Sequence, residues 1–344
     1  MVSFLQTSRA TMSQRIRLGF LTHLEGTGDP RTIYQETLAL FVAADQLGFD
    51  VGWVAQHHFR IHAGRLPSPF PFLAAAAERT KRLRLGTSIV VMPLEHPLRV
   101  AEDAAVVDAL CDGRLELGVG SGGEAGEFQA FGLDMARRRE LTSDGMSMLQ
   151  RALRGESLSD SGQRLDPPAP TLSERLWQSA LSAAGVQYVA QQGVGLMLSR
   201  AAWVPGKSTD QVQAPLAKAY VEAWAGQPAL PRVGLSRGIY PAADKQTALA
   251  ALRVPVMRSA ENMIKQGNVA AGLPLEVYCE RMHIAYGHPD EVAAYLLADQ
   301  VLPYATDLIF QFNPVTPPLA QAIAMLEQIA AQIAPALGWR ASGE

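Results

Sequence analysis

The chain has 344 residues, 48% of them hydrophobic and 18% charged, and carries a formal net charge of −3. This composition is typical of a globular protein and gives no electrostatic reason to expect nucleic acid or a membrane surface as a partner. The two cysteines, Cys111 and Cys279, lack metal-ligand spacing and indicate reduced thiols in a cytoplasmic protein, with a single disulfide as the alternative.

The first 14 residues are expected to form a disordered tail. They mix Ser, Thr, Arg and Gln and lack the apolar core of a secretory signal. Met12 offers an alternative start. No later apolar run approaches the roughly 18 residues that a membrane helix needs. We therefore expect a single domain over residues 15–340.

Short β-like segments alternate with helix-like segments along this domain. A capping box at Thr32 and Gln35 is predicted to open the first helix, Pro97–Leu110 is predicted as a later helix, and Pro317–Pro318 is predicted to open the last one. The eight predicted strands are Ile16–Thr22, Phe49–Ala55, Leu83–Val91, Arg114–Gly120, Leu176–Ser179, Gly195–Ser199, Val233–Ile239 and Asp307–Phe312. This alternation predicts an α/β fold, with right-handed βαβ units closed into a (β/α)₈ TIM barrel.

Two longer segments interrupt the alternation. Residues 155–172 are rich in Gly, Ser and Pro and predict a long loop, whereas residues 241–283 are mostly helical in pattern. Insertions after barrel strands often cover an active site, so either segment could lie over one.

Two adjacent histidines, His57 and His58, follow the second predicted strand. The carboxyl ends of barrel strands carry the catalytic groups, and imidazole can move protons near neutral pH. We therefore predict catalytic roles for both. The alternative is that one is packed and the other bonds a neighbouring loop. A metal site that includes His62 is also conceivable. However, adjacent strand residues point to opposite faces and no carboxylate completes a ligand set, so we predict no metal.

A glycine-rich segment, residues 118–123, matches the pattern G-x-G-x-x-G, and Glu140 lies about twenty residues downstream, where a ribose-binding acid is sought. The segment follows the fourth strand, however, and residues 124–132 predict a poor helix. We interpret it as a rim loop whose glycines let the backbone approach a bound ring or phosphate, with a Rossmann site as the alternative.

A possible phosphate site lies between the fifth strand and its helix. Residues 180–185 are small and include Ser182, and the N–H groups and dipole of a helix N-terminus suit a phosphate. Arg139 would supply a charge-assisted partner. The alternatives are an ordinary serine N-cap and a solvated surface arginine.

Further motifs follow one another in a distinctive order. They are Gly48–Asp50, Trp53, Gln56–Phe59, Arg84–Thr87, Pro93–Asp103, Asp108–Leu110, Gly113–Gly120 and Phe131–Asp134, with a weaker continuation through Leu176–Ser199, Gly287–Val292 and the last strand. As a set they resemble the bacterial luciferase-like flavin-dependent monooxygenase family, most strongly over residues 15–150.

The resemblance implies a luciferase-type barrel that binds reduced flavin mononucleotide (FMN), supplied by a separate flavin reductase. Together with dioxygen, the enzyme would oxidise an aldehyde or another small organic substrate. The resemblance implies that His57 is catalytic, with His58 beside it, and that the protein is a homodimer. Light emission does not follow from it.

The resemblance also assigns cofactor-binding positions. Arg139 and Ser182 match phosphate contacts, and Ser199 and Arg200 match ring contacts on the sixth strand. The glycine-rich loop, with Gly120 and Ser121, would approach the cofactor, and Thr87 and Ser88 would lie in the strand beneath the flavin ring. A non-proline cis peptide bond is expected there, at Ser88–Ile89.

Three positions depart from the family pattern. Gln56 replaces a glutamate and removes a charge that could tune His57, whereas Ser121 replaces an arginine and Gly185 a threonine, which thins the phosphate clamp. Two alternatives stay open: a deazaflavin-dependent hydride-transfer enzyme of the same superfamily, and a flavin-binding protein that has lost its chemistry.

Overall fold

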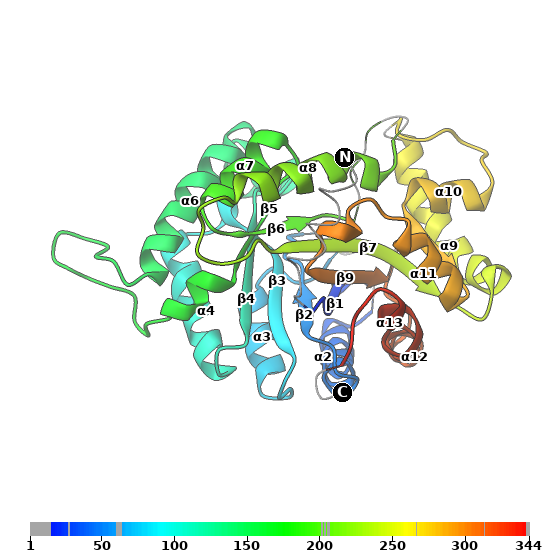
Figure 1. Ribbon diagram of the computed structural model, residues 1–344, viewed down its shortest axis with the longest axis horizontal. Helices are drawn as coiled ribbons and strands as arrows, with labels where there is room; N and C mark the ends of the chain where they lie inside the picture. The colour runs from blue at the N-terminus through cyan, green and yellow to red at the C-terminus, as the bar shows by residue number, and fades with distance from the viewer. Residues whose placement is uncertain are drawn as a thin grey trace.

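The computed structural model describes residues 15–26, 28–59, 64–200, 202, 204, 207–265, 267–312 and 314–341. Within these ranges, eight parallel strands close into a barrel, because β1 pairs with both β2 and β9 and β6 pairs with β7 (Figure 1). The barrel strands are β1 (Arg17–Thr22), β2 (Val51–Val54), β3 (Arg84–Val91), β4 (Leu115–Gly120), β5 (Leu176–Ser179), β6 (Gly195–Leu198), β7 (Val233–Pro241) and β9 (Asp307–Phe312). The predicted (β/α)₈ barrel and its eight strands are confirmed, whereas the predicted tail over residues 1–14 lies outside the described residues.

Helices surround the barrel and cover the outer faces of its strands (Figure 1). The longer ones are α2 (Pro30–Gln46), α3 (Pro69–Ala77), α4 (Pro97–Leu110), α6 (Arg138–Leu153), α7 (Ala183–Gln191), α8 (Thr209–Ala223), α9 (Lys245–Lys265), α11 (Pro289–Leu297) and α12 (Leu319–Gln328). Shorter turns of helix are η1 (Met92–Leu94), α5 (Ala125–Ala130), η2 (Met135–Arg137), η3 (Pro170–Arg175), α10 (Leu275–Arg281), η4 (Leu302–Tyr304), η5 (Ile329–Ile333) and α13 (Ala334–Ala336).

Helix boundaries follow capping chemistry, with one correction. Helix α4 spans the predicted residues, and α12 begins directly after Pro318. The predicted capping box at the first helix is wrong. Helix α2 begins at Pro30, with Asp29 as its N-cap, because the Asp29 carboxylate accepts from Thr32 N at 3.0 Å. Proline directly after the cap is favoured because its missing N–H has no partner there in any case.

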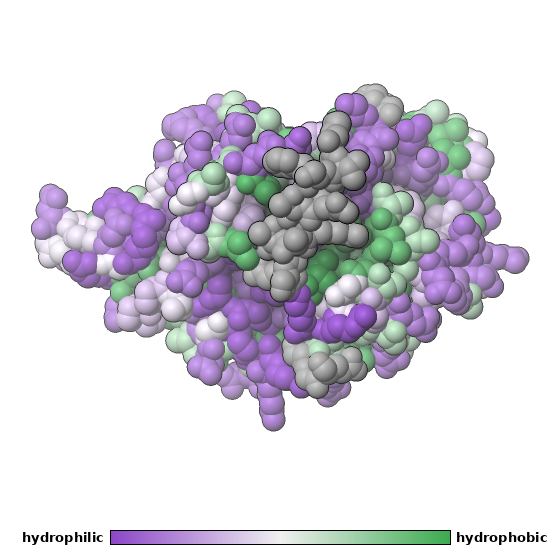
Figure 2. Space-filling model, viewed as in Figure 1, coloured by the Kyte–Doolittle hydropathy of each residue, from purple (hydrophilic) through white to green (hydrophobic). Residues whose placement is uncertain are grey.

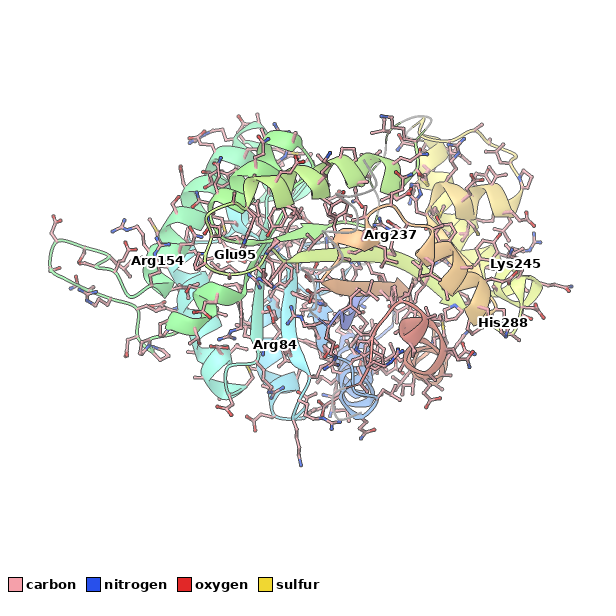
Figure 3. The ribbon with its side chains drawn as sticks, viewed as in Figure 1. Arg84, Glu95, Arg154, Arg237, Lys245 and His288 are labelled. Carbon is pink, nitrogen blue, oxygen red and sulfur yellow. The ribbon has the colours of Figure 1, made fainter. Side chains whose placement is uncertain are left out.

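The two interrupting segments lie at opposite ends of the barrel. Residues 155–172 lead from α6 towards β5, so they belong to the amino ends of the strands and not to the active-site end, and the expectation that they could cover a site is wrong. Arg154 marks the start of this loop, which extends away from the barrel (Figure 3). Residues 241–283 follow the carboxyl end of β7 and form α9 and α10. The next residues form β8 (Ile284–Gly287), a strand that the sequence pattern did not predict and that pairs with the end of β7.

Two indole rings fill the inside of the barrel. Trp53 and Trp177 are fully buried and meet edge to face, with ring centroids 5.9 Å apart. Glycines make room for them: a Cβ atom at Gly86 would lie 2.2 Å from the Trp53 ring, and one at Gly195 would lie 2.5 Å from the Trp177 ring. Bulky side chains that face small ones are the usual way to fill a barrel of this size.

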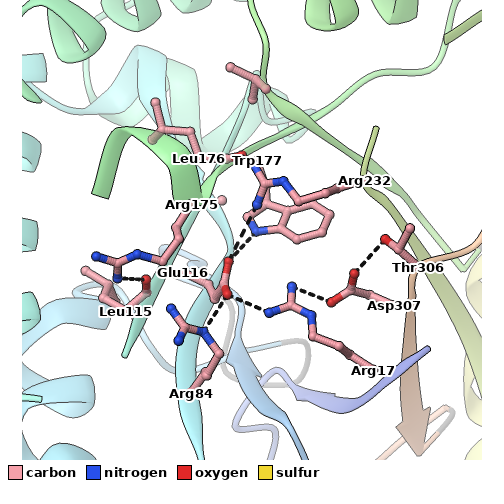
Figure 4. A network of polar contacts seen from close by, with 12 residues as sticks. Arg17, Arg84, Leu115, Glu116, Arg175, Leu176, Trp177, Arg232, Thr306 and Asp307 are labelled. Carbon is pink, nitrogen blue, oxygen red and sulfur yellow. Dashed lines mark hydrogen bonds and ion pairs between the residues drawn. The ribbon is translucent and has the colours of Figure 1, made fainter. Parts of the chain in front are cut away.

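The amino ends of the strands are closed by a buried ionic network centred on Glu116 (Figure 4). Glu116 accepts from Arg17 Nη1 at 2.8 Å, Arg84 Nε at 2.6 Å and Trp177 Nε1 at 2.7 Å. Burial alone would raise the pKa of Glu116, but the neighbouring guanidinium groups outweigh burial and lower this pKa to about 2. The network therefore seals this end of the barrel, and the opposite end is left for chemistry.

The surface is mixed, and hydrophilic side chains dominate the face in Figure 2. Among the described residues, no helix is long and apolar enough to cross a membrane. Cys111 and Cys279 are both buried free thiols, as expected from their spacing.

Candidate active site

A pocket of about 760 Å³ opens at the carboxyl ends of β1 to β5. Strand ends supply its floor, and the segments that follow β4 and β5 supply its walls. Its lining residues are His23, Ala55, Gln56, His57, Ser88, Ile89, Val91, Ser121, Gly122, Gly123, Glu124, Glu127, Met135, Arg138, Arg139, Thr142, Ser143, Gln178, Ser179, Ala180, Leu181, Ser182, Gly185 and Tyr188. Pockets of this size and position hold small molecules and cofactors in other barrels.

Half of the predicted site residues meet in this pocket. Its lining includes His57, Ser88, Ser121, Arg139 and Ser182, which come from five separate segments of the chain. The expected cis peptide bond at Ser88–Ile89 is present. The other five predicted residues, His58, Thr87, Gly120, Ser199 and Arg200, do not line the pocket.

His57 is held between two other side chains. Its Nε2 lies 3.0 Å from His23 Nδ1, and its Nδ1 lies 3.9 Å from Glu127 Oε1. A glycine makes room for the ring, because a Cβ atom at Gly64 would lie only 2.4 Å from His57 Cδ2. The His57 ring therefore has neighbours on three sides, and these fix its orientation, as proton transfer requires.

His58 turns away from the pocket and is buried. Its ring packs edge-on against Phe131 with centroids 4.9 Å apart, and its Nε2 lies 3.1 Å from Gln56 Nε2. Burial lowers the pKa of His58, against the opposing effect of the Glu95 carboxylate. These contacts fit the packed role that the sequence left open as the alternative for one of the two histidines.

Gln56 joins the loops around this histidine. Its Oε1 accepts from Val91 N at 2.7 Å, and its Nε2 donates to Glu95 Oε1 at 2.6 Å, with Glu95 labelled in Figure 3. A glutamate at position 56 would face a second carboxylate and could not donate to it. Glu95 therefore favours an amide at position 56, where the resemblance implies a glutamate.

The end of the pocket nearest α7 is suited to an anion. Arg138 and Arg139 line it, and Ser182 caps α7, where its Oγ accepts from Gly185 N at 3.2 Å. The hydroxyl groups of Ser143 and Tyr188 lie 3.2 Å from each other in the same wall. Cations, hydroxyls and a helix N-terminus are the groups that bind phosphate in proteins.

Two of these groups could take the place of phosphate contacts that the resemblance assigns to other residue types. Ser121 and Gly185 stand where the resemblance implies an arginine and a threonine, and Arg138 and Tyr188 bring a second cation and a further hydroxyl to the same pocket. A Cβ atom at Gly185 would lie 3.1 Å from Ser182 Oγ, so a larger residue would crowd that hydroxyl.

The glycine-rich segment is a rim loop. Ser121, Gly122 and Gly123 line the pocket, whereas Gly120 lies at the end of β4, where a Cβ atom would meet Ser179 Oγ at 2.5 Å. Glu140, the possible ribose acid of the Rossmann alternative, forms an exposed ion pair with Arg137 at 2.8 Å. Residues 124–132 contain α5, contrary to the expectation of a poor helix, and α5 brings Glu127 to the pocket.

The remaining predicted residues have other surroundings. Thr87 Oγ1 donates to Gly118 O at 2.8 Å and accepts from Gly118 N at 2.9 Å, which ties β3 to β4. The carbonyl of Ser199 accepts from Gln213 Nε2 at 2.8 Å. Burial lowers the pKa of Arg200 against the opposing charge of Glu25, whose own pKa burial raises to about 6.

Pocket residues that the sequence did not indicate include His23, Glu127 and Gln178. His23 directly follows β1 and Gln178 lies in β5, so both occupy strand-end positions that the barrel prediction itself marks as functional. Glu127 lies in the helix that was not predicted, and no local pattern indicated it.

The donor set of this pocket fits a flavin. Gln178 is 8% exposed and lines the pocket, and its Oε1 has no hydrogen-bond partner within the described part of the chain. A buried orphan acceptor is costly unless a bound molecule donates to it, as a flavin ring N–H could. Ser88 and Ile89 could lie against the ring, and Arg138, Arg139 and Ser182 could hold the phosphate.

A metal is not indicated by the same residues. Within the described ranges, no three His, Cys, Asp or Glu side chains are grouped so that they could hold an ion. His62, which the metal alternative included, lies outside those ranges.

Known proteins share sequence and fold with this chain. A sequence model of the family described as luciferase-like monooxygenase matches residues 16–300. The 4-hydroxyprotoasukamycin monooxygenase of Streptomyces nodosus subsp. asukaensis is 34% identical over 213 residues, which cover 58% of this chain and 57% of that protein. The chain spans about half the length of the curated relatives it matches.

Solved structures of similar fold cover nearly the whole chain. Monooxygenase RslO1 from Streptomyces bottropensis has a TM-score of 0.79 at 24% identity, over 93% of this chain and 99% of that one. The oxygenating constituent of 3,6-diketocamphane monooxygenase from Pseudomonas putida, solved in complex with FMN, has a TM-score of 0.71 at 16% identity, over 93% and 98%. Enzymes that depend on coenzyme F420, a deazaflavin, share the fold as well.

Proposed function

The chain belongs to the luciferase-like monooxygenase family, and on that premise we propose that it is an FMN-dependent monooxygenase, an oxidoreductase that acts on a small organic substrate. The observation that carries the proposal is that one pocket combines an oriented imidazole with an anion-binding end. His57 lies at the carboxyl end of β2, and Arg138, Arg139 and the start of α7 line the same pocket.

Reduced FMN, when bound, supplies two electrons to dioxygen, so that one oxygen atom enters the substrate and the other leaves as water. The protein would provide position, protons and shielding. Arg139 and Ser182 would hold the phosphate, and Gln178 Oε1 would accept a ring N–H. His57 would give and take protons beside the reacting atoms. Ala55 and Ile89 would form an apolar wall that excludes water.

Cofactor identity is tested by thermal unfolding of the protein under anaerobic conditions. Reduced FMN should raise the Tm with increasing concentration, because it binds the folded state alone. Reduced coenzyme F420 serves as the comparison. A rise with F420 and none with FMN would instead support a hydride-transfer enzyme and overturn the proposal. No rise with either would refute the assignment of the pocket to a flavin.

Oxygen transfer is tested with chemically reduced FMN, labelled dioxygen and a panel of aldehydes and ketones, with products analysed by mass spectrometry. Product that carries one labelled oxygen atom is expected. The variant His57→Ala should bind FMN as the parent does but lose roughly 100-fold or more in turnover, as expected for loss of a general acid–base group. His96→Ala is the control, because His96 lies outside the pocket at the start of α4. Full turnover by His57→Ala would refute the role of His57.

We further propose that a separate reductase supplies reduced FMN and that the chain forms a homodimer. The similar Pseudomonas protein, described as an oxygenating constituent, supports the first of these. Reduction of FMN by NADH or NADPH with the purified chain alone would contradict it. A monomer mass in analytical ultracentrifugation would contradict the dimer.

A further inference from the structure

His57 belongs to a chain of four polar side chains that leads away from the pocket. Its Nε2 lies 3.0 Å from His23 Nδ1, and the two ring planes differ by only 25°. His23 Nε2 lies 3.2 Å from Gln311 Oε1, and Gln311 Nε2 donates to Ser236 Oγ at 2.5 Å. Gln311 and Ser236 are both buried; Gln311 lies near the carboxyl end of β9, and Ser236 lies in the middle of β7.

The side-chain amide of Gln311 determines which ring nitrogens of His23 and His57 carry hydrogen. Gln311 Oε1 has no hydrogen to donate, so His23 Nε2 carries the hydrogen of that contact. A neutral imidazole carries hydrogen on only one ring nitrogen, so His23 Nδ1 is an acceptor. With the Gln311 amide oxygen facing His23 and both rings neutral, the hydrogen between the two rings belongs to His57 Nε2.

The second nitrogen of His57 faces a carboxylate. His57 Nδ1 lies 3.9 Å from Glu127 Oε1, and this oxygen is held in place because it accepts from His58 N at 3.0 Å. A proton added at Nδ1 would create a positive charge opposite Glu127, and a nearby opposite charge favours the charged form of an imidazole.

We propose that His23 is a positioning residue that keeps the hydrogen of His57 on Nε2 and so makes Nδ1 the atom that exchanges protons during turnover. In other enzymes, a neighbouring side chain that hydrogen-bonds one nitrogen of a catalytic imidazole fixes its tautomer and orientation. The proton that Nδ1 takes up is the one it returns, so the ring ends each cycle in its starting tautomer. The inference rests on the proposed function of His57.

The tautomer is read directly by nuclear magnetic resonance on the full-length protein, labelled with ¹⁵N at histidine and free of cofactor. Long-range proton–nitrogen spectra distinguish the nitrogen that carries hydrogen from the one that does not, and His57→Gln assigns the signal. The spectra are recorded near pH 8.5, where histidine side chains of ordinary pKa are neutral. The parent protein should show hydrogen on His57 Nε2. Hydrogen on Nδ1 would overturn the proposal.

Two substitutions of His23 distinguish a role in fixing the tautomer of His57 from a role in packing alone. Asparagine keeps an acceptor oxygen where Nδ1 lies, so His23→Asn should preserve the tautomer of His57. Leucine removes the acceptor, so His23→Leu should give a mixture of tautomers. Identical His57 signals in His23→Leu and the parent would overturn the proposal. If His23→Leu fails to fold, the tautomer in the parent and in His23→Asn decides alone.

Turnover supplies the second readout. In His23→Leu, kcat should fall roughly tenfold to a hundredfold, because a misplaced proton-transfer group costs rate and not binding. KM should stay nearly unchanged, and His23→Asn should recover most of kcat. Parent-like kcat in His23→Leu would overturn the proposal. If no variant and no parent protein transfers oxygen, the proposed function fails, and the tautomer spectra still judge the positioning role of His23.

Discussion

Replacing Gly64 by alanine should displace the His57 ring and slow oxygen transfer. The added Cβ atom would lie 2.4 Å from His57 Cδ2 and 2.9 Å from Cγ. Non-bonded carbon atoms prefer separations of about 3.5 to 4.0 Å. Relief of this overlap requires the ring to move by roughly 1 Å, and a shift of that size can cost roughly 100-fold in rate. We therefore expect kcat of Gly64→Ala to fall by that order.

The chain offers a matched control away from the pocket. Gly155 also has a positive φ and does not line the pocket, and a Cβ atom there would meet no atom within 4 Å, so Gly155→Ala adds the same methyl group without displacing a side chain. Gly64 also has a φ of +156°, which side chains rarely adopt, so Gly64→Ala should lose about 1–3 kcal/mol of stability. Turnover is therefore compared well below the Tm of both variants.

Turnover of Gly64→Ala equal to that of Gly155→Ala would refute the expected displacement of the His57 ring. Unchanged His57 signals in the nitrogen spectra of Gly64→Ala would refute it equally. A fall in kcat together with altered His57 signals supports the steric account.

Two further predictions concern the barrel and the pocket. The folded structure lowers the pKa of Glu116 from 4.5 to about 2, and a shift of this size corresponds to about 3 kcal/mol of stability. Glu116→Gln removes the charge and should therefore lower the free energy of unfolding by about 3 kcal/mol. Because this pKa is depressed in the folded state, the stabilisation is complete above the unfolded value and is lost as the pH falls towards 2. The difference between parent and variant in urea unfolding should therefore shrink on acidification, and a constant difference contradicts the charge network as its source. Gln178→Leu replaces the glutamine by a side chain of similar size that lacks the unpartnered acceptor Oε1. The protein without cofactor should therefore keep or raise its Tm, while its affinity for FMN should fall roughly tenfold. Unchanged affinity would exclude Gln178 from the flavin site.

Local sequence patterns determined the barrel and one side of its site. Runs without polar side chains such as Val51–Val54 predict strands because burial on both faces requires continuous apolar sequence. The alternation then implies which strand ends share a rim, so the sequence predicts that His57 and Ser182 lie near one another, and the resemblance adds Arg139.

Only the tertiary structure decided which neighbours those residues have. His23 and His57 are 34 positions apart, and Glu127 reaches the pocket from a six-residue helix that no strong periodicity marks. His58 shares the strand end of His57, yet packing against Phe131 turns it away. Such contacts depend on crossing geometry and side-chain volume between distant segments, which a one-dimensional pattern does not contain. The sequence thus determined the barrel and the imidazole, and packing decided how that imidazole is held.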